Sequence, residues 1–324
     1  MSDAYRRTVL MGDPAHFSVQ GGANPHTRNR LGMRRSVNRE LAIQQWQHLR
    51  DLLRDLGVRV IVVPPDPAHP GLVYPANAGV MSDVDLEMPL DEKVFTLSNL
   101  LPTRAGEKAH YRKLLEPMGF LLDEIDDDIR FEGEADFFPV GDRFLLTCGR
   151  LEKQRFVPRW GLPPWRRVYG FRTDARVEPL LAEIASGREI HRLELVLEAH
   201  YHGDTALCAF GNKREFLLAF RRGLTAAGFS LLRELFGDRL IEIEDVDASR
   251  YAANSFTYAD GNEPVLVMPD GVTDRLLGQI RERGVKPITI DVSEFLKKGG
   301  GSVKCMIGDL GLIRGRDLTE ATEK

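Results

Sequence analysis

Apolar and polar positions along the chain follow two alternating periods, one typical of buried strands and one of amphipathic helices. The segment "RRTVLMGDP" predicts an opening strand that stops at Asp13-Pro14. A helix is expected next, because apolar residues recur near helical spacing across residues 41–56 and Asn38 is a suitable N-cap. The segment "VRVIVVPP" then predicts a buried strand. The first 65 residues or so therefore favour a strand–helix–strand order.

This alternation of strand pairs with single helices recurs about five times. Strands are predicted in "GLVYPANAGVM", in "EKVFTLSNL", in "EPVLVMP" and on both sides of a turn at Gly141-Asp142. Helices are predicted in "GEKAHYRKLLEPMGF", "DARVEPLLAEIA" and "TDRLLGQIRERG". The pattern is typical of an α/β protein, and no low-complexity linker divides it. We therefore expect a single domain over residues 1–324.

One segment departs from this pattern. Residues 149–170, "GRLEKQRFVPRWGLPPWRRVYG", are basic and rich in Trp and Pro, and they show no clean period. We interpret them as an inserted loop or hairpin that acts as a lid.

Composition excludes several classes of protein. Of the 324 residues, 43% are hydrophobic and 28% are charged, which fits a globular protein rather than a disordered one. The net charge of −4 and the mixing of both signs give no reason to expect nucleic acid or a membrane as partner. No apolar run is long enough for a signal peptide or a membrane helix. A small-molecule substrate is the expected partner, and a homo-oligomer remains open.

Cysteine usage is sparse. The three cysteines, Cys148, Cys208 and Cys305, are widely spaced and form no CxxC pair, so neither a disulfide framework nor a zinc site is predicted. This pattern fits a reducing cytoplasm. Cys305 follows three consecutive glycines, Gly299 to Gly301, and is either a small core residue before a last strand or a nucleophile.

Two other stretches carry candidate chemistry. In "YHGDT", His202 and Asp204 are two residues apart, so on an extended segment both side chains point the same way, although these residues alone favour a turn with a polar His and a capping Asp. In "FEGEADFF", alternation along a strand would put Glu132, Glu134 and Asp136 on one face. A thiol, an imidazole and a carboxylate are together the parts of thiolate catalysis.

Six short motifs, in chain order, carry a resemblance to a known superfamily. "YHGDT" resembles H-x-D-T, "FEGEAD" resembles F-E-G-x-G-D with Ala135 at the usual glycine, and "YPANAG" resembles F-T-A-N-A-G. "NPHTR", "YGFRTD" and the glycine-rich "GGGSVKCM" also match. Together they resemble the guanidino-group-modifying enzymes, which include arginine deiminases, dimethylarginine hydrolases, arginine dihydrolases and amidinotransferases. The likeness spans residues 8–312.

The resemblance implies a pentein fold, an α/β propeller of five similar units around a pseudo-fivefold axis, with the active site in its central funnel. It implies that Cys305 attacks a guanidinium carbon to form a covalent amidino-thioether. His202 would transfer protons, and Glu132 would pair with this histidine or with the substrate's nitrogens. Asp204 would grip the guanidinium, and substrate-binding roles are implied for Asn77, Asn24 and, less directly, Glu134. No metal or organic cofactor is implied, because the sulfur supplies the covalent step.

The match fails at one place. Asn99 and Leu100 stand where the family has an arginine, and one of the family's arginines there is thought to bind the α-carboxylate of the substrate. Arg28 or an arginine of the insert would have to substitute, or the substrate would carry a different tail.

Three functions remain open from the sequence. The first is a hydrolase acting on the guanidino group of arginine or a similar compound. The second is an amidinotransferase, which shares the covalent half-reaction but lacks support here because F-D-A-A-D is absent. The third is a non-catalytic binder on the same fold. A papain-type protease is not favoured, because its cysteine would lie early in the chain.

Overall fold

The computed structural model describes residues 4–19, 24–29, 33–152, 155–159, 162–259 and 263–318. Within these residues, five three-stranded sheets share one plan, in which the middle strand pairs antiparallel with one neighbour and parallel with the other. The five sheets are β17–β1–β2 (Gly308–Arg314, Tyr5–Gly12, Arg59–Val63), β3–β4–β5 (Gly79–Met81, Val94–Leu97, Leu121–Glu124), β6–β7–β10 (Phe137–Val140, Arg143–Cys148, Glu189–Glu194), β11–β12–β13 (Leu207–Phe210, Phe216–Ala219, Leu240–Glu242) and β14–β15–β16 (Phe256–Tyr258, Val265–Pro269, Lys286–Ile290).

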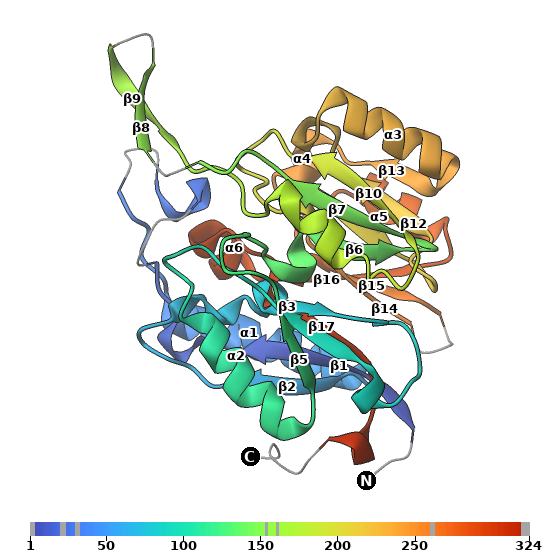
Figure 1. The fold of residues 1–324 in the computed structure, drawn as a ribbon. Helices are drawn as coiled ribbons and strands as arrows, with labels where there is room; N and C mark the ends of the chain where they lie inside the picture. The colour runs from blue at the N-terminus through green and yellow to red at the C-terminus, as the bar shows by residue number, and fades with distance from the viewer. Residues whose placement is uncertain are drawn as a thin grey trace.

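Each parallel pair needs a crossover, and helices supply it in four of the five units. The helices of the described chain are α1 (Arg39–Asp55), α2 (Glu107–Leu115), α3 (Ala226–Phe236), α4 (Asp245–Ala248), α5 (Asp274–Arg281) and α6 (Ser293–Gly299). Of these, α1, α2, α3 and α5 cross between the parallel strands of their own sheets. The fivefold repetition expected from the sequence is therefore present, and it is the pentein arrangement (Figure 1).

The third unit differs from the others. Its crossover contains a hairpin, β8–β9 (Arg155–Arg159, Leu162–Val168), and the 3₁₀ helix Ala175–Leu181 in place of an α-helix. The α-helix predicted there does not form, and Pro179 inside the segment explains why, since proline offers no N–H to the helix ladder. The hairpin projects from the body of the molecule (Figure 1) and lies within the predicted insert, of which residues 153–154 and 160–161 are outside the described residues.

Local predictions near the motifs need correction. "GLVYPANAGVM" is mostly two 3₁₀ turns, begun by Pro70 and Pro75, and only Gly79–Met81 is a strand. "FEGEAD" and "YHGDT" are also 3₁₀ turns, at Gly133–Ala135 and Gly203–Thr205. The turn that the residues of "YHGDT" alone favoured is therefore present, and the strand alternation considered for both motifs is not, because a tight turn sends neighbouring side chains in different directions.

The ends of the described chain meet in one sheet. β1 lies between β17, its antiparallel partner, and β2, its parallel partner (Figure 1). The sheet of the first unit therefore contains a strand from the C-terminal part of the chain. Cys305 lies in the 3₁₀ turn Lys304–Met306, immediately before β17. This pairing therefore holds the C-terminal cysteine against elements from the N-terminal half. Among the described residues, no helix is long and apolar enough to cross a lipid bilayer.

Candidate active site

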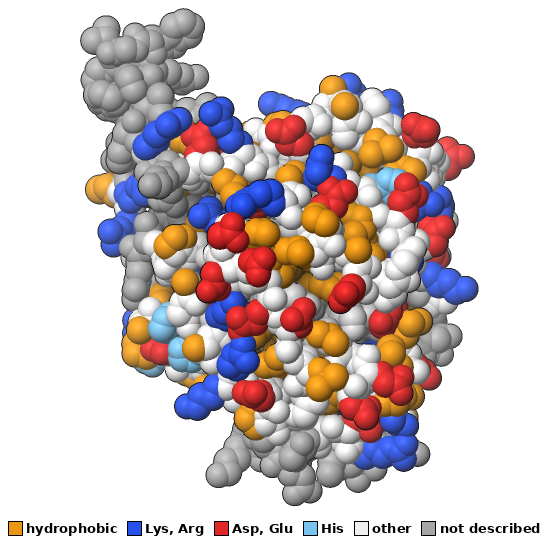
Figure 2. All heavy atoms as spheres, in the orientation of Figure 1, with side chains coloured by type: hydrophobic (Ala, Val, Ile, Leu, Met, Phe, Trp, Pro, Cys, Tyr) orange, Lys and Arg blue, Asp and Glu red, His pale blue; other side chains and the backbone are white. Residues whose placement is uncertain are grey.

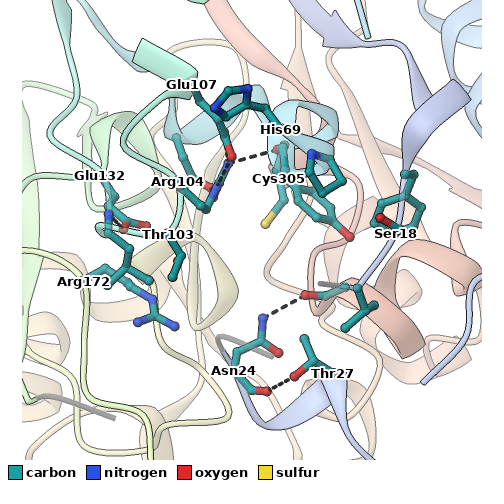
Figure 3. Close-up of a pocket in the computed structure, with 18 of the residues that line it drawn as sticks. Ser18, Asn24, Thr27, His69, Thr103, Arg104, Glu107, Glu132, Arg172 and Cys305 are labelled. Atoms are coloured by element: carbon teal, nitrogen blue, oxygen red, sulfur yellow. Dashed lines mark hydrogen bonds and ion pairs between the residues drawn. The ribbon is translucent and has the colours of Figure 1, made fainter. Parts of the chain in front are cut away.

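Five of the eight predicted site residues line one cavity of about 140 Å³, roughly five water volumes, and Asp204 lies just behind its wall, hydrogen-bonded to the Cys305 thiol. Cys305, His202, Glu132, Asn77 and Asn24 all line it, and they come from widely separated segments. Figure 3 shows the sulfur of Cys305 pointing into the space between these walls. The thiol and the imidazole thus face one cavity, as the motif analysis expected.

The three glycines before Cys305 allow close packing against an aromatic wall. A Cβ on Gly299 or Gly301 would overlap the Tyr74 ring or its hydroxyl, and Gly300 has a φ of +82° and ends α6 in the left-handed region. Tyr74 is itself fixed by donating its hydroxyl to the carbonyl of Phe295 at 3.1 Å. The glycine run therefore fits the loop around Tyr74.

Asn254, which the sequence analysis missed, organises the nucleophile loop. Its Oδ1 accepts hydrogen bonds from the backbone N–H groups of Ser302 and Cys305, both at 3.1 Å. Its Nδ2 donates to Cys305 Sγ at 3.1 Å and to the carbonyl of Asp204 at 3.2 Å. Asn254 is fully buried, so this single amide ties the loop to the "YHGDT" turn.

The carboxylate beside the thiol disfavours ionisation of the thiol. Cys305 Sγ donates to Asp204 Oδ2 at 3.5 Å. Burial, followed by the charge of Asp204, raises the pKa of Cys305 well above that of an ordinary thiol. Burial also raises the pKa of Asp204 to about 6, although His202 opposes this. Asp204 Oδ1 is buried with no hydrogen-bond partner among the described residues. The pair therefore provides a hydrogen-bond acceptor, Asp204 Oδ1, that no described residue uses.

His202 and Glu132 form a buried ion pair. His202 Nε2 lies 2.8 Å from Glu132 Oε2, and Glu132 Oε1 accepts the backbone N–H of Leu101 at 3.1 Å. Burial opposes the charge on Glu132, but the hydrogen bond and charge of His202 outweigh it and set the carboxyl pKa at about 2. Burial likewise opposes the charge on His202, yet Asp136 and Glu132 raise its pKa. The imidazolium is therefore favoured, and its Nδ1 has no hydrogen-bond partner within the described chain.

Asp136, the last residue of "FEGEAD", supports this pair from behind. It accepts hydrogen bonds from the hydroxyls of Thr147 at 2.6 Å and Thr173 at 2.7 Å, and from the N–H of Gly203 at 2.9 Å. Burial raises the pKa of Asp136. The residue does not line the cavity, so it positions the turn that carries His202.

Two arginines line the cavity, and neither is at the position where the sequence lacks one. Arg104 is held by Glu107, at 2.8 and 2.7 Å, and donates to Asn77 Oδ1 at 2.8 Å. Arg172, from "YGFRTD", is 2% exposed and lies over the Tyr201 ring at 5.0 Å. Burial lowers the pKa of Arg172 and Glu132 partly offsets this, but a guanidinium stays charged. Positive charge is therefore present in the cavity.

Asn99 and Leu100 have structural roles. The side-chain amide of Asn99 donates to the carbonyls of Ile125, Asp126 and Ile129, at 2.8, 2.8 and 3.1 Å. Leu100 is buried. Neither residue lines the cavity, so the missing arginine is not a gap in its wall.

The remaining predicted residues differ in placement. Asn24 is buried and donates through Nδ2 to the carbonyl of Gly299 at 2.8 Å, so it supports the nucleophile loop as well as the cavity wall. Glu134 lies elsewhere, paired with Lys304 Nζ at 2.6 Å and accepting the N–H of Asp309 at 2.7 Å. Arg28 is not among the described residues that line the cavity. Glu134 and Arg28 are therefore corrected to positions outside the cavity.

Comparisons with known proteins find relatives described as dimethylarginine and arginine hydrolases. A family model described as eukaryotic N,N dimethylarginine dimethylhydrolase matches residues 230–312. A dimethylarginine dimethylaminohydrolase of Mycobacterium tuberculosis is 29% identical over 299 residues, which cover 92% of this chain and 84% of that protein. A bifunctional arginine dihydrolase/ornithine cyclodeaminase of Nostoc sp. is 28% identical over 302 residues, covering 93% of this chain and 37% of that protein. The chain therefore spans only part of the bifunctional relative.

These similarities support the resemblance to the guanidino-group-modifying superfamily that the sequence motifs carry. Solved structures show the same fold. The N-terminal domain of the cyanobacterial arginine dihydrolase ArgZ, bound to product, matches with a TM-score of 0.77 at 24% identity, over 94% of this chain and 97% of that one. A dimethylarginine dimethylaminohydrolase adduct with S-methyl-L-thiocitrulline matches with a TM-score of 0.64 at 20% identity, over 94% of this chain and 99% of that one.

Replacing Asn254 with alanine tests its role in the loop. Asn254→Ala leaves two buried backbone N–H groups without an acceptor, so we expect the free energy of unfolding to fall by about 1–3 kcal/mol, measured by urea denaturation. Asn212→Ala, at an exposed turn, is the matched control and should change little. Equal stability of Asn254→Ala and wild type would contradict this role.

The raised pKa of Asp204 predicts that the ionised carboxylate lowers the free energy of unfolding at neutral pH. A carboxyl whose pKa is higher folded than unfolded stabilises the fold only while protonated, so its contribution is lost as pH rises from 3.8 toward about 6. Asp204→Asn should therefore be more stable than wild type above pH ~6, by at most about 3 kcal/mol, with the difference shrinking toward pH 4. Denaturation at both pH values measures this, with exposed Asp142→Asn as the control. The assignment would be refuted if Asp204→Asn were less stable than wild type at pH 7 and if this difference did not change between pH 4 and pH 7.

Proposed function

We propose that this protein is a cysteine-dependent hydrolase that acts on the guanidino group of arginine or an arginine-like compound. The observation that carries the proposal is the meeting of a thiol, Cys305, and an imidazolium, His202, at one cavity, with the buried carboxylate of Asp204 hydrogen-bonded to the thiol and holding an unused oxygen. The similar proteins named above act, by their descriptions, on arginine or dimethylarginine, which supports the same substrate class.

Guanidinium recognition falls chiefly to Asp204. A guanidinium is a planar cation that only donates hydrogen bonds, so it needs acceptors. Both oxygens of Glu132 already accept bonds, from His202 and Leu101, whereas Asp204 Oδ1 accepts none from the described residues. Asp204 therefore grips the substrate, and Glu132 orients His202.

The substrate itself helps to activate the nucleophile. In the free protein, burial and Asp204 keep Cys305 as a neutral thiol. A bound cation next to Asp204 offsets that negative charge and favours the thiolate. Asn254 Nδ2, which donates to Sγ, stabilises the anion that forms. Ionisation of the thiol is thus coupled to binding of the guanidinium.

The chemical steps follow from this placement. The thiolate attacks the guanidinium carbon and a C–S bond forms. The C–N bond to the leaving amine then breaks, and His202 Nδ1, which has no protein partner in the described chain, donates the proton that the amine needs. Water next attacks the amidino-thioether, His202 takes the proton of that water, and the C–S bond breaks to restore Cys305.

Asn77 fits the second half-reaction. Because Arg104 only donates, its partner must be Asn77 Oδ1, which fixes the amide orientation and leaves Nδ2 as a donor. Nδ2 is buried without a hydrogen-bond partner among the described residues, and a donor there cannot bind a guanidinium N–H. It suits the oxygen of a water molecule or of the product. This observation favours hydrolysis over amidino transfer.

The tail of the substrate is assigned to Arg172. An α-carboxylate needs a cation inside the cavity, and Arg104 is already engaged by Glu107, Asn77 and the carbonyl of Gly71. Arg172 lies on the wall that carries Glu132 (Figure 3). We therefore favour a substrate that carries a carboxylate, such as arginine or a methylated arginine.

Cysteine substitutions test the mechanism. Cys305→Ser should lower turnover of arginine or dimethylarginine by at least about 10⁴-fold, because the nucleophile is lost. Acid-quenched wild-type protein should show an amidino adduct by intact mass, and Cys305→Ser should show none. The controls are Cys208→Ala and Cys148→Ala, since both thiols are buried outside the cavity and have pKa values raised by burial to about 12 and 11. Loss of activity in folded Cys208→Ala, or turnover that requires added glycine, would count against the hydrolase.

Arg172 provides a test of the substrate tail. Removing a charge-assisted pair of about 1.5–3 kcal/mol predicts that Arg172→Ala raises KM for arginine roughly 10- to 100-fold. KM for agmatine, which lacks the carboxylate, should change little. Steady-state kinetics on both compounds measure the difference, with the exposed Arg176→Ala as the matched control. Equal losses for the two compounds would reject the assignment.

A further inference from the structure

A second cluster of potential ligands lies at the rim of the cavity. Asp66 and His69 belong to the loop after β2, and His110 lies on α2. Their side chains are 27%, 27% and 30% exposed, so solvent reaches the cluster. Figure 2 shows pale-blue histidine side chains next to an acidic group on the same face as α2. His69 also lines the cavity, whereas Asp66 and His110 do not.

Three atoms of this cluster face one another. Asp66 Oδ2 lies 3.2 Å from His69 Nδ1 and 3.0 Å from His110 Nε2, and the two nitrogens are 3.2 Å apart. A tetrahedral Zn²⁺ site with bonds near 2.0–2.1 Å has ligand–ligand edges of about 3.3 Å. The triangle is therefore close to one face of such a tetrahedron.

Hydrogen bonding alone satisfies this triangle poorly. If both imidazoles donate N–H to Asp66 Oδ2, the two protons crowd each other near that oxygen, because the nitrogens are only 3.2 Å apart. If one imidazole turns a lone pair inward, that lone pair competes with the carboxylate for a single proton. One cation placed above the triangle would satisfy all three lone pairs at once.

The surrounding chain holds the ligands in place without a metal. Asp66 Oδ1 accepts the backbone N–H of Ala68 at 2.7 Å, which leaves Oδ2 for the histidines. The His69 ring packs so closely on Gly106 that a Cβ there would overlap its Nε2. Fixed orientation of this kind favours metal affinity.

We propose that Asp66 Oδ2, His69 Nδ1 and His110 Nε2 bind a divalent transition metal ion of the Zn²⁺ class at the cavity rim. The fourth position is open to water or to another ligand. The ion ties the loop after β2 to α2, and both of these elements contribute to the cavity wall, through Gly71 and Glu107. Cysteine spacing predicted no metal site. Such spacing cannot indicate these ligands, because none of them is a cysteine and His110 is distant from the other two in sequence.

The test must separate this site from the nucleophile, since thiolates also bind zinc. Titration calorimetry with Zn²⁺ is therefore carried out on full-length Cys305→Ser. We expect one ion to bind, together with a rise in the melting temperature. Addition of Co²⁺ in place of Zn²⁺ should give a visible absorption band of a low-symmetry N/O site. The site rests on none of the catalytic steps proposed above, so failure of either idea leaves the other standing.

Two ligand variants and one control complete the experiment. Asp66→Asn and His110→Asn, each in the Cys305→Ser background, should weaken Zn²⁺ binding at least about tenfold. His48→Asn, an exposed histidine on α1, should bind as tightly as its parent. Absence of binding to Cys305→Ser, or unchanged binding in both ligand variants, would overturn the proposal. Metal-free circular dichroism of each variant checks that a loss of binding is not a loss of fold.

Discussion

A buried carboxylate with no ion-pair partner at contact distance in the described chain is the constraint around which this site is built. Asp204 is buried, one of its oxygens has no partner in the described chain, and its nearest polar neighbour on the other oxygen is a thiol. Such a group is costly to bury, and it persists because backbone and side-chain hydrogen bonds fix the turn that carries it. Asn254 reaches this turn from one side and Asp136 from the other. The unfavourable charge becomes favourable only when a flat cation enters.

The second requirement is that His202 and Cys305 both carry a proton before a substrate binds. The ion pair of His202 with Glu132 stores a proton on the imidazole, and the environment of Cys305 keeps another on the sulfur. Burial and the charge of Asp204 keep the proton on the thiol, whereas Asp136 and Glu132 keep the proton on the imidazole against the effect of burial. The site therefore needs little reorganisation when substrate binds, which is the usual origin of electrostatic catalysis in a closed cavity.

Much of this architecture could be predicted from the sequence, and the limits have physical causes. The strands, α1 with its Asn38 cap and the fivefold alternation follow from local periodicity and capping. The motifs predicted Cys305 and His202 at one cavity, and both residues line it. The strand alternation considered for "YHGDT" and "FEGEAD" does not occur, because both motifs form 3₁₀ turns. The role of Asn254 could not be predicted from local sequence, because this residue accepts hydrogen bonds from backbone N–H groups that lie 48 and 51 residues further along the chain.

The pairing of β1 with β17 has a consequence for the order of folding. Closing this sheet joins segments about three hundred residues apart, as with the Arg7 and Asp309 side chains, 302 positions apart, so loop-closure entropy opposes it until the intervening units are formed. The turn that carries Cys305 directly precedes β17, and it is set in place only when the ring closes. An incompletely folded chain therefore carries a thiol with neither its amide donor nor its neighbouring acid. Such a thiol is open to alkylating reagents, and the completed ring conceals it.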